Sequence, residues 1–392
     1  MSSGVTVLAF YDRISLYHTL APWLVGAHHP GGQQPGASRG ASPRITWTDD
    51  PQWCLTRDRN EHLIIVRRFL KPPIADLALM QRLRDRYRRI FFLNGNAGGG
   101  LHRPEVLPFV DRFYTKAAFT DRAVYLRDLY GAELFTDFAH RTYGIDDPDP
   151  VVTPAISEDQ LSKIHRHWNI GVGDFPRRKL VQRAGVALAR APGGSPRFAG
   201  ALIHRSEMVS PSPLAPPALD GYRGDGYRYD VNARLGTPGY PTIAFHRKHL
   251  GAILSAAADR HGWRVARDRV PMRRYFSDMQ RSRVTFSPFG WGELCFRDFE
   301  AVRAGSLLIK PDMGHLETWP DIFRAGETYI PIRWDGTDLE ETFAYWIDPA
   351  HDAERLGIVH AAHRRLQTQL TELPGRSAAV LGDLLDSDGR DN

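Results

Sequence analysis

One segment reads Ser287-Pro-Phe-Gly-Trp-Gly-Glu-Leu-Cys-Phe-Arg-Asp-Phe-Glu-Ala-Val-Arg-Ala-Gly305, and its order of residue types predicts a turn followed by a helix. The β-branched and aromatic residues at 284–286 predict a short strand just before it. Gly290 and Gly292 allow the backbone of the turn to pass close to a ligand. Neither proline nor glycine interrupts residues 293–304, so we expect these to be helical. Strand, turn and helix in this order are typical of a phosphate-binding unit in an α/β protein.

The expected helix carries three charged residues on one face. Glu293, Arg297 and Glu300 lie at i, i+4 and i+7, which share a face at 3.6 residues per turn. Backbone N–H groups at a helix N-terminus suit a phosphate, an arginine adds a positive fork, and a carboxylate can accept hydrogen bonds from sugar hydroxyls. The arrangement fits a nucleotide diphosphate. Spacing alone leaves open the alternative that these residues form salt bridges on a solvated helix face.

Residues 240–335 resemble the donor-binding segment of GT-B glycosyltransferases, most closely the exostosin-like family. The resemblance is carried by the Arg-x-x-Glu-Ala pattern at 297–301 and by Gly305 with the apolar strand after it. It implies an α/β fold of two Rossmann-like domains with a cleft between them. It also implies a nucleotide-sugar donor whose ribose binds Glu300 and whose phosphates lie near Arg297.

The resemblance does not decide the stereochemical outcome. Many retaining GT-B enzymes have seven residues between two paired glutamates, whereas six separate Glu293 from Glu300 here. Inverting and retaining transfer therefore both stay open.

Composition fits this fold class and limits the partners. A chain of 392 residues with 42% hydrophobic residues is long enough for two packed domains. The formal net charge of +6 and the pI near 9.3 favour anionic ligands such as nucleotide sugars or acidic glycans. The excess is too small to predict nucleic-acid binding.

Cysteine usage and hydropathy bear on location. Cys54 and Cys295 are far apart, which predicts neither a disulfide framework nor a zinc site and is typical of a reducing compartment. The N-terminal residues lack the basic and apolar regions of a signal peptide, and no run approaches the ~20 apolar residues of a membrane span. We therefore expect a cytoplasmic protein, with contact to the inner face of the membrane as a further option.

A break in composition at 191–196, rich in proline and glycine, predicts a boundary between two domains. We expect an acceptor-side Rossmann-like domain over 1–190 and a nucleotide-sugar-binding Rossmann-like domain over 197–350. Residues 351–392 supply a C-terminal helix and tail, and the resemblance implies that this helix packs back toward the first domain. Long irregular loops are expected at 28–42 and 209–241. The expected strands are 5–10, 63–66, 90–93, 263–266, 284–286 and 307–309, and an apolar run at 198–203 follows the domain boundary.

The donor site is expected to combine the turn, the helix and two further basic residues. Arg247 opens a helix and could meet the phosphates across from Arg297. Lys310 ends a strand, where open α/β sheets bind ligands, and Trp291 could stack on a base or sugar. The alternatives are a helix start at the surface for Arg247, packing in a domain core for Trp291 and packing in a loop for Lys310. The predicted donor-binding residues are Arg247, Ser287, Gly290, Trp291, Gly292, Arg297, Glu300 and Lys310.

An inverting transfer also needs a general base that takes the proton of the acceptor hydroxyl. In GT-B enzymes the base normally projects from the first domain. Asp12 and His18 follow the first expected strand, and Asp111 lies beyond the turn at 94–98. Glu293, nearer the leaving group, is a further candidate.

Three other patterns have simpler interpretations. Asp147-Pro-Asp149 matches the Asp-x-Asp motif of metal-dependent GT-A enzymes, but its prolines indicate a turn. His165 and His167 have no third ligand nearby in sequence, so a zinc site is not predicted. The arginine-rich run at 82–89 is expected to be a solvated helix face, with docking to lipid headgroups as the alternative. We expect no metal cofactor.

The predicted function is metal-independent transfer of a sugar from a UDP-, GDP- or CMP-linked donor to a glycan or lipid-linked acceptor, in the building of a polysaccharide or glycoconjugate. One alternative is a GT-B-like protein that binds a nucleotide sugar without transfer, as an epimerase or a non-catalytic scaffold. A second alternative is a basic module that binds acidic glycans.

Overall fold

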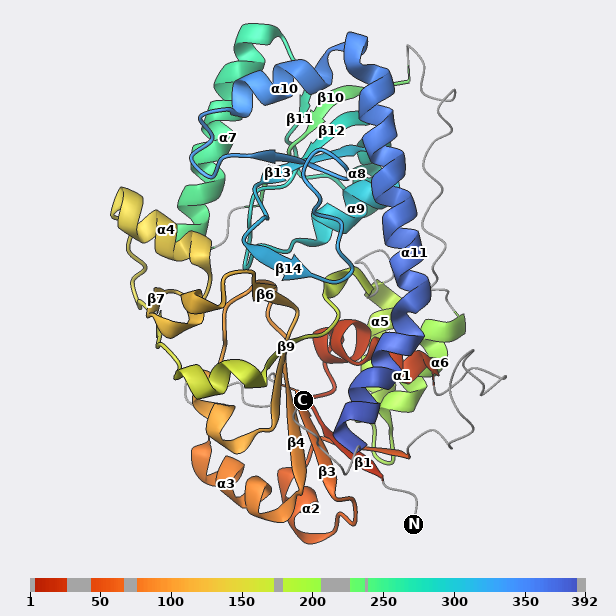
Figure 1. Ribbon diagram of the computed structural model, residues 1–392. Helices are drawn as coiled ribbons and strands as arrows, with labels where there is room; N and C mark the ends of the chain where they lie inside the picture. Colours follow the sequence, from red (N-terminus) through yellow and green to blue (C-terminus); the bar gives the residue numbers. More distant parts are fainter. Residues whose placement is uncertain are drawn as a thin grey trace.

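The structure is a computed structural model that describes residues 4–26, 44–66, 76–172, 179–205, 226–236 and 239–385. It has two α/β domains, one in the lower and one in the upper half of Figure 1, and a long C-terminal helix that runs along both. The loop expected at 28–42 and most of the excursion expected at 209–241 lie outside the described residues.

The first domain is built on a parallel sheet of order β2-β1-β3-β4-β5-β9. Its central strands are apolar runs buried along their length, as parallel strands covered on both faces require. The strands are β1 (Val5–Leu8), β2 (Ile45–Thr48), β3 (His62–Val66), β4 (Arg89–Asn94), β5 (Arg112–Thr115) and β9 (Ile164–Arg166). The helices around it are α1 (Ala21–Gly26), α2 (Pro51–Thr56), α3 (Leu77–Arg86), α4 (Leu134–Tyr143), α5 (Lys179–Arg190) and α6 (Pro196–Arg205).

The second domain has a parallel sheet of order β11-β10-β12-β13-β15. The strands are β10 (Tyr229–Asn232), β11 (Val265–Ala266), β12 (Ser282–Phe286), β13 (Leu307–Pro311) and β15 (Ile330–Ile332). Its helices are α7 (Pro241–His261), α8 (Met272–Gln280), α9 (Phe296–Ala304) and α10 (Leu339–Ile347). Two parallel sheets, each with helices between its strands, make the two Rossmann-like domains of the GT-B fold, as expected from the sequence.

Backbone pairing and a helix cap join the two domains. β6 (Ala117–Phe119) of the first domain pairs antiparallel with β14 (Leu316–Thr318) of the second. The carboxylate of Asp147 accepts hydrogen bonds from Thr242 N at 3.0 Å and Thr242 Oγ1 at 2.8 Å, and so caps α7 from the other domain. The aspartate of the Asp-x-Asp pattern thus serves as a cap. A second antiparallel pair, β7 (Leu129–Tyr130) with β8 (Val152–Thr153), lies within the first domain.

The C-terminal helix α11 (Asp352–Leu385) continues through Pro374. It contacts α9 and β13 of the second domain and α1 and β4 of the first.

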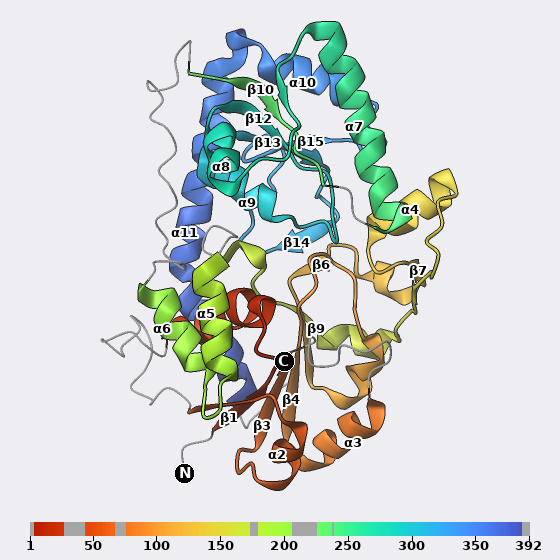
Figure 2. The same ribbon diagram turned by 180° about the vertical axis from the view of Figure 1, so that it is seen from behind.

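α6 differs from the expectation. The apolar run 198–203 was placed just after the expected domain boundary, at the start of the second domain, but it lies within α6, which packs against α1 and α5 (Figure 2).

Candidate functional site

A cavity of about 640 Å³ lies between the two domains. It is bordered by the carboxyl ends of strands in both sheets, where ligands bind in open α/β folds. Its volume is in the range of sites that hold a drug-sized or nucleotide-sized ligand. The residues that line it are Ile14, Gly95, Asn96, Ala97, His102, Lys116 and Ile170 from the first domain, and Arg247, Tyr275, Gly290, Trp291, Leu294, Cys295, Phe296, Arg297 and Glu300 from the second.

The second-domain wall is the turn after β12 and the first turn of α9. The expected helix begins three residues later than predicted, at Phe296, because Asp298 accepts a hydrogen bond from Cys295 N at 2.9 Å and caps it there. Glu293 therefore lies in the turn and does not share a helix face with Arg297. The predicted end at Gly305 is confirmed, since Gly305 has a φ of 74° as the C-cap.

Two guanidinium groups of this wall are held by backbone carbonyls. Arg297 Nη2 donates to Arg234 O at 2.7 Å, while its Nε and Nη1 are buried without a hydrogen-bond partner among the described residues. Arg247 Nε donates to Phe289 O at 2.7 Å. A methyl group on Gly290 would lie 2.5 Å from Arg247 Nη2, so glycine lets this arginine lie against the turn.

Glu300 lies one turn deeper on α9 and is buried. It accepts a hydrogen bond from Tyr275 Oη at 2.7 Å. Burial raises the pKa of Glu300, while Tyr275 and Arg297 act in the opposite direction. Trp291, in contrast, is 65% exposed at the edge of the cavity, where its ring contacts Tyr240 edge-on.

Ser287 and Lys310, both predicted to bind the donor, lie beneath the turn instead of in the cavity. Lys310 is fully buried, with its Nζ 3.2 Å from Asp298 Oδ2 and 3.1 Å from Ser287 O. Ser287 Oγ donates to Asp298 Oδ1 at 2.5 Å. β13 is a central strand covered on both faces, so the ammonium of Lys310 needs a buried counter-charge, which Asp298 supplies. These residues support the wall.

The first-domain wall is a glycine-rich turn at 95–100. Asn96 Nδ2 donates to Gly98 O at 2.8 Å and to Gly100 O at 2.7 Å, which fixes the turn. It touches the turn of the second domain, because Leu294 N donates to Ala97 O at 2.7 Å. Gly292 does not line the cavity but permits this contact, since a methyl group on it would lie 2.6 Å from the backbone of Ala97.

Two buried glutamates meet behind this contact. A methyl group on Gly98 would lie 2.0 Å from Glu293 Oε2 and 2.2 Å from Glu133 Oε2. His315 Nε2 lies 3.5 Å from Glu293 Oε1, and His102 Nε2 lies 3.4 Å from Glu133 Oε1. Of these four residues, His102 lines the cavity.

The predicted base candidates are not brought together in the cavity. Asp12 Oδ1 accepts a hydrogen bond from Ser15 N at 2.9 Å, just before the π-helix η1 (Ser15–Thr19). His18 is fully buried behind the cavity wall, with its ring 5.0 Å from that of Phe296. Burial lowers the pKa of His18 well below its usual value, and the charge of Lys116 lowers it further. Asp111 lies at the other edge of the sheet, where it accepts from Ile90 N at 2.7 Å and pairs with Arg84.

Sequence patterns alone did not single out His102, Lys116 and Tyr275. They come from three separate segments, and each becomes part of the site only because the fold brings those segments to one cavity. The glycine-rich run after the strand at 90–93 was the available signal for the first-domain wall. Over the described ranges, no three His, Cys, Asp or Glu side chains are grouped as a metal site requires.

No family model matches the chain, and no curated protein matches it. Several solved structures have a similar fold. A UDP-forming α,α-trehalose-phosphate synthase from Burkholderia xenovorans is 11% identical, with 98% of this chain and 99% of that chain covered and a TM-score of 0.43. A glycosyltransferase from Rickettsia africae is 9% identical over 99% and 100% of the two chains, with a TM-score of 0.44.

HepE from Anabaena, solved in complex with UDP, is 11% identical over 97% of this chain and 100% of that chain, with a TM-score of 0.41. The described helices include none that is long and apolar enough to cross a membrane. The GT-B fold assignment itself rests on the two parallel sheets and the cavity between their carboxyl ends.

Proposed function

We propose that this protein is a glycosyltransferase that transfers a sugar from a nucleotide-sugar donor to a glycan or lipid-linked acceptor, in the building of a polysaccharide or glycoconjugate. One observation carries the proposal. Arg247, Arg297, the N-terminus of α9 and Glu300 all face one cavity between two Rossmann-like domains. Positive groups beside a buried carboxylate suit a diphosphate followed by a ribose.

In this proposal the diphosphate lies against Arg247, Arg297 and the N–H groups at the start of α9. Glu300 accepts hydrogen bonds from the ribose hydroxyls, and the exposed ring of Trp291 covers the base or the sugar. As the bond between the anomeric carbon and the phosphate oxygen breaks, the electron pair leaves with the phosphate. The two guanidinium groups stabilise the charge that develops there, which supports metal-independent transfer.

The acceptor hydroxyl forms the new bond to the anomeric carbon and loses its proton to a base. We propose that His102 is this base for an inverting reaction, since it is the imidazole that lines the cavity from the first domain. The carboxylate of Glu133, 3.4 Å from His102 Nε2, would orient the ring and stabilise the imidazolium. Asp12, His18 and Glu293 would then have supporting roles.

Isothermal titration of the full chain with UDP, GDP and CMP nucleotides tests the donor site. We expect one of these nucleotides to bind, and Glu300→Ala to weaken that binding about tenfold, as loss of a charged hydrogen-bond acceptor predicts. Absence of binding by all three to the folded protein would overturn the proposal.

Turnover of His102→Gln separates chemistry from binding. We expect nucleotide affinity to stay within about twofold of the wild type while kcat falls at least ~100-fold, the usual contribution of a general base. If kcat were unchanged, His102 would not be the base, although the donor site would stand. Nucleotide binding without transfer to any acceptor would favour a protein that binds the donor without catalysing transfer.

A further inference from the structure

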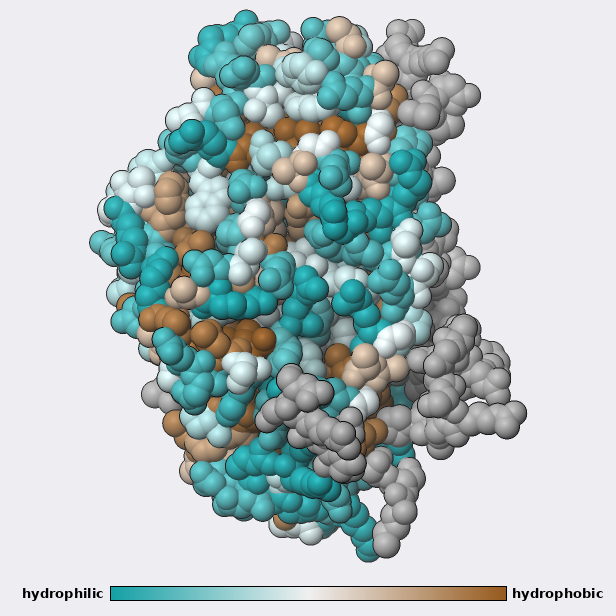
Figure 3. Space-filling model, viewed as in Figure 1, coloured by the Kyte–Doolittle hydropathy of each residue, from teal (hydrophilic) through white to brown (hydrophobic). Residues whose placement is uncertain are grey.

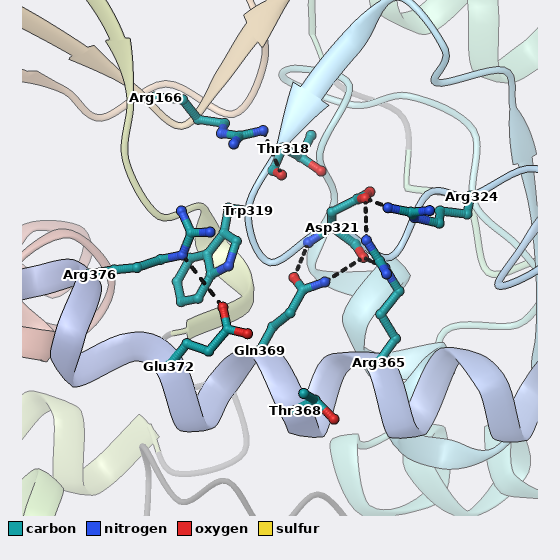
Figure 4. A pocket seen from close by; sticks show the side chains of 10 residues that line it. All are labelled: Arg166, Thr318, Trp319, Asp321, Arg324, Arg365, Thr368, Gln369, Glu372 and Arg376. Atoms are coloured by element: carbon teal, nitrogen blue, oxygen red, sulfur yellow. Dashed lines mark hydrogen bonds and ion pairs between the residues drawn. The ribbon is translucent and has the colours of Figure 1, made fainter. Parts of the chain in front are cut away.

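A second cavity, of about 530 Å³, lies beside α11 where the two domains meet (Figure 4). None of its lining residues lines the cleft described above. Three parts of the fold contribute: Arg166 at the end of β9, the segment 318–324 of the second domain, and the middle of α11. Figure 3 shows that this region of the surface is hydrophilic.

One side of this cavity is closed by interactions around Asp321. Arg365 Nη2 pairs with Asp321 Oδ2 at 2.7 Å, and Arg324 Nε lies 3.5 Å from the same oxygen. Gln369 Nε2 donates to Asp321 O at 3.2 Å. Figure 4 shows these side chains converging on Asp321. On this side two guanidinium groups share the single carboxylate of Asp321, so their positive charge is only partly compensated.

The other side has two guanidinium groups with unused donors. Arg166 Nη1 donates to Thr318 O at 3.2 Å, and its ion pair with Glu317 is long, at 4.0 Å. Arg376 makes no hydrogen bond within the described residues; its Nε is 3.7 Å from Glu372 Oε2. Most of the five N–H donors of each guanidinium thus remain available.

The surroundings of these two arginines favour an added negative charge. Burial lowers the pKa of Arg166, Glu317 opposes this, and the positive charge of Arg376 lowers the pKa further. Four arginines and only two carboxylates line the cavity. An anion between Arg166 and Arg376 would relieve this repulsion.

Two buried polar atoms at the cavity also lack partners. Thr318 Oγ1 and Trp319 Nε1 make no hydrogen bond in the part of the chain that the structure describes, although both residues are only 3% exposed. Arg376 covers the Trp319 ring at 4.6 Å from its centroid. Buried hydroxyl and indole groups normally have a partner, and a bound polar ligand would supply it.

We propose that this cavity is a binding site for a sugar that carries one oxyanion group, held between Arg166 and Arg376. The oxyanion is a phosphate or a carboxylate, since both match the guanidinium fork. The volume exceeds what an oxyanion alone would fill, and Thr318 and Glu372 offer partners for sugar hydroxyls. This cavity is separate from the proposed donor site, and the proposal of a sugar-binding site here does not depend on the proposed glycosyltransferase function.

Calorimetric titration of the full chain, in the presence of saturating nucleotide, tests this site. The probes are mannose 6-phosphate, glucuronate, neutral glucose and inorganic phosphate. We expect at least one anionic sugar to bind and glucose to show no binding. Arg166→Gln and Arg376→Gln should each weaken the binding at least tenfold. Arg364→Gln, on an exposed arginine of the same helix, is the matched control and should leave it unchanged.

The two anionic probes identify the oxyanion: binding of mannose 6-phosphate alone assigns a phosphate, and binding of glucuronate alone assigns a carboxylate. Three results would overturn the proposal. The first is that neither anionic sugar binds the wild type. The second is that inorganic phosphate binds as tightly as the better sugar. The third is that both variants bind the sugar as tightly as the wild type does. Urea unfolding of the variants that matches that of the wild type shows that they are folded, so failure here is distinct from failure of the donor site.

Discussion

The two walls of the cleft differ in how they are built. The second-domain wall has its charges fixed by a buried network in which Lys310 and Asp298 are both fully buried, and its Arg297 is tied to a backbone carbonyl. The first-domain wall is a glycine-rich turn shaped by the side-chain amide of Asn96. The charged groups of the second-domain wall are thus held in fixed positions, whereas the surface of the first-domain wall is formed mainly by its backbone.

This difference suggests a division of labour between the walls. Preorganised positive charge suits the donor diphosphate, because the groups do not have to reorient when charge develops in the transition state. A wall made mostly of backbone leaves room for an acceptor, with His102 and Lys116 as the ionisable groups that line it. If the division holds, changes to the two walls should affect stability, donor binding and catalysis in different ways.

The largest effect is expected for Lys310→Met. Removing one partner of a buried ion pair leaves Asp298 uncompensated, which typically costs about 3–5 kcal/mol. Chemical denaturation should therefore show a loss of this size in the free energy of unfolding. Lys248→Met, on an exposed lysine of α7, should change it by less than ~0.5 kcal/mol. Equal stabilities of the two variants would contradict the supporting role of Lys310.

Donor affinity should fall with Arg297→Gln. Loss of a charge-assisted hydrogen bond to phosphate costs about 1.5–3 kcal/mol, or roughly 10- to 100-fold in Kd. Calorimetric titration with the nucleotide that binds the wild type measures it. Arg303→Gln, near the other end of α9, retains the cavity residues and should bind within about threefold of the wild type. If both variants bound equally, the diphosphate would not lie on this wall.

The Gly292→Ala substitution should disrupt the contact between the turn of the second domain and the turn at 95–100 of the first. Its methyl group would meet the backbone of Ala97 at 2.6 Å, and such overpacking typically costs about 1–3 kcal/mol. We expect a lower melting temperature and weaker turnover, because the two turns can no longer meet. Gly357→Ala in α11, where nothing lies within 4 Å, should be neutral or slightly stabilising. A fully active Gly292→Ala variant would show that the contact is dispensable.

Acid should destabilise the protein through its buried neutral histidines. Burial, together with the charges of Lys310 and Arg247, lowers the pKa of His246 to about 3. Between pH 6.5 and 3 the unfolded chain therefore binds a proton that the folded chain does not, so stability falls as pH falls. The slope is about 1.4 kcal/mol per pH unit for each such histidine.

Urea unfolding of the wild type and His246→Gln at pH 7 and pH 5 measures this term. The wild type should lose more stability over this interval than the variant does. Identical losses would mean that His246 is not buried and neutral in the folded state.

The second-domain wall could be largely predicted from the sequence because it is nearly contiguous. Strand, turn and helix all fall between 282 and 305, and Arg297 and Glu300 line the cavity. Two details could not be predicted. The start of α9 at Phe296 depends on the hydrogen bond from Cys295 N to the carboxylate of Asp298. The burial of Lys310 depends on which strands lie beside β13 in the sheet.

The first-domain wall could not be predicted in the same way because its residues are dispersed along the chain. His102 and Lys116 follow different strands and meet only in the folded sheet. Asp111 shows the opposite case. It comes just before β5, and the residue before a parallel strand lies at the amino edge of the sheet, away from the cleft. Asp111 follows the turn at 94–98 in the sequence, which suggested that the two lie close together. The chain between them crosses back to the amino edge of the sheet before the next parallel strand begins, so Asp111 lies away from the turn.

A crystal structure of the complex with the nucleotide that binds most tightly tests the central claim most directly. The account predicts the diphosphate between Arg247 and Arg297 at the start of α9, with the ribose hydroxyls on Glu300. A nucleotide bound elsewhere, for instance in the cavity beside α11, with the inter-domain cleft unoccupied, would contradict it.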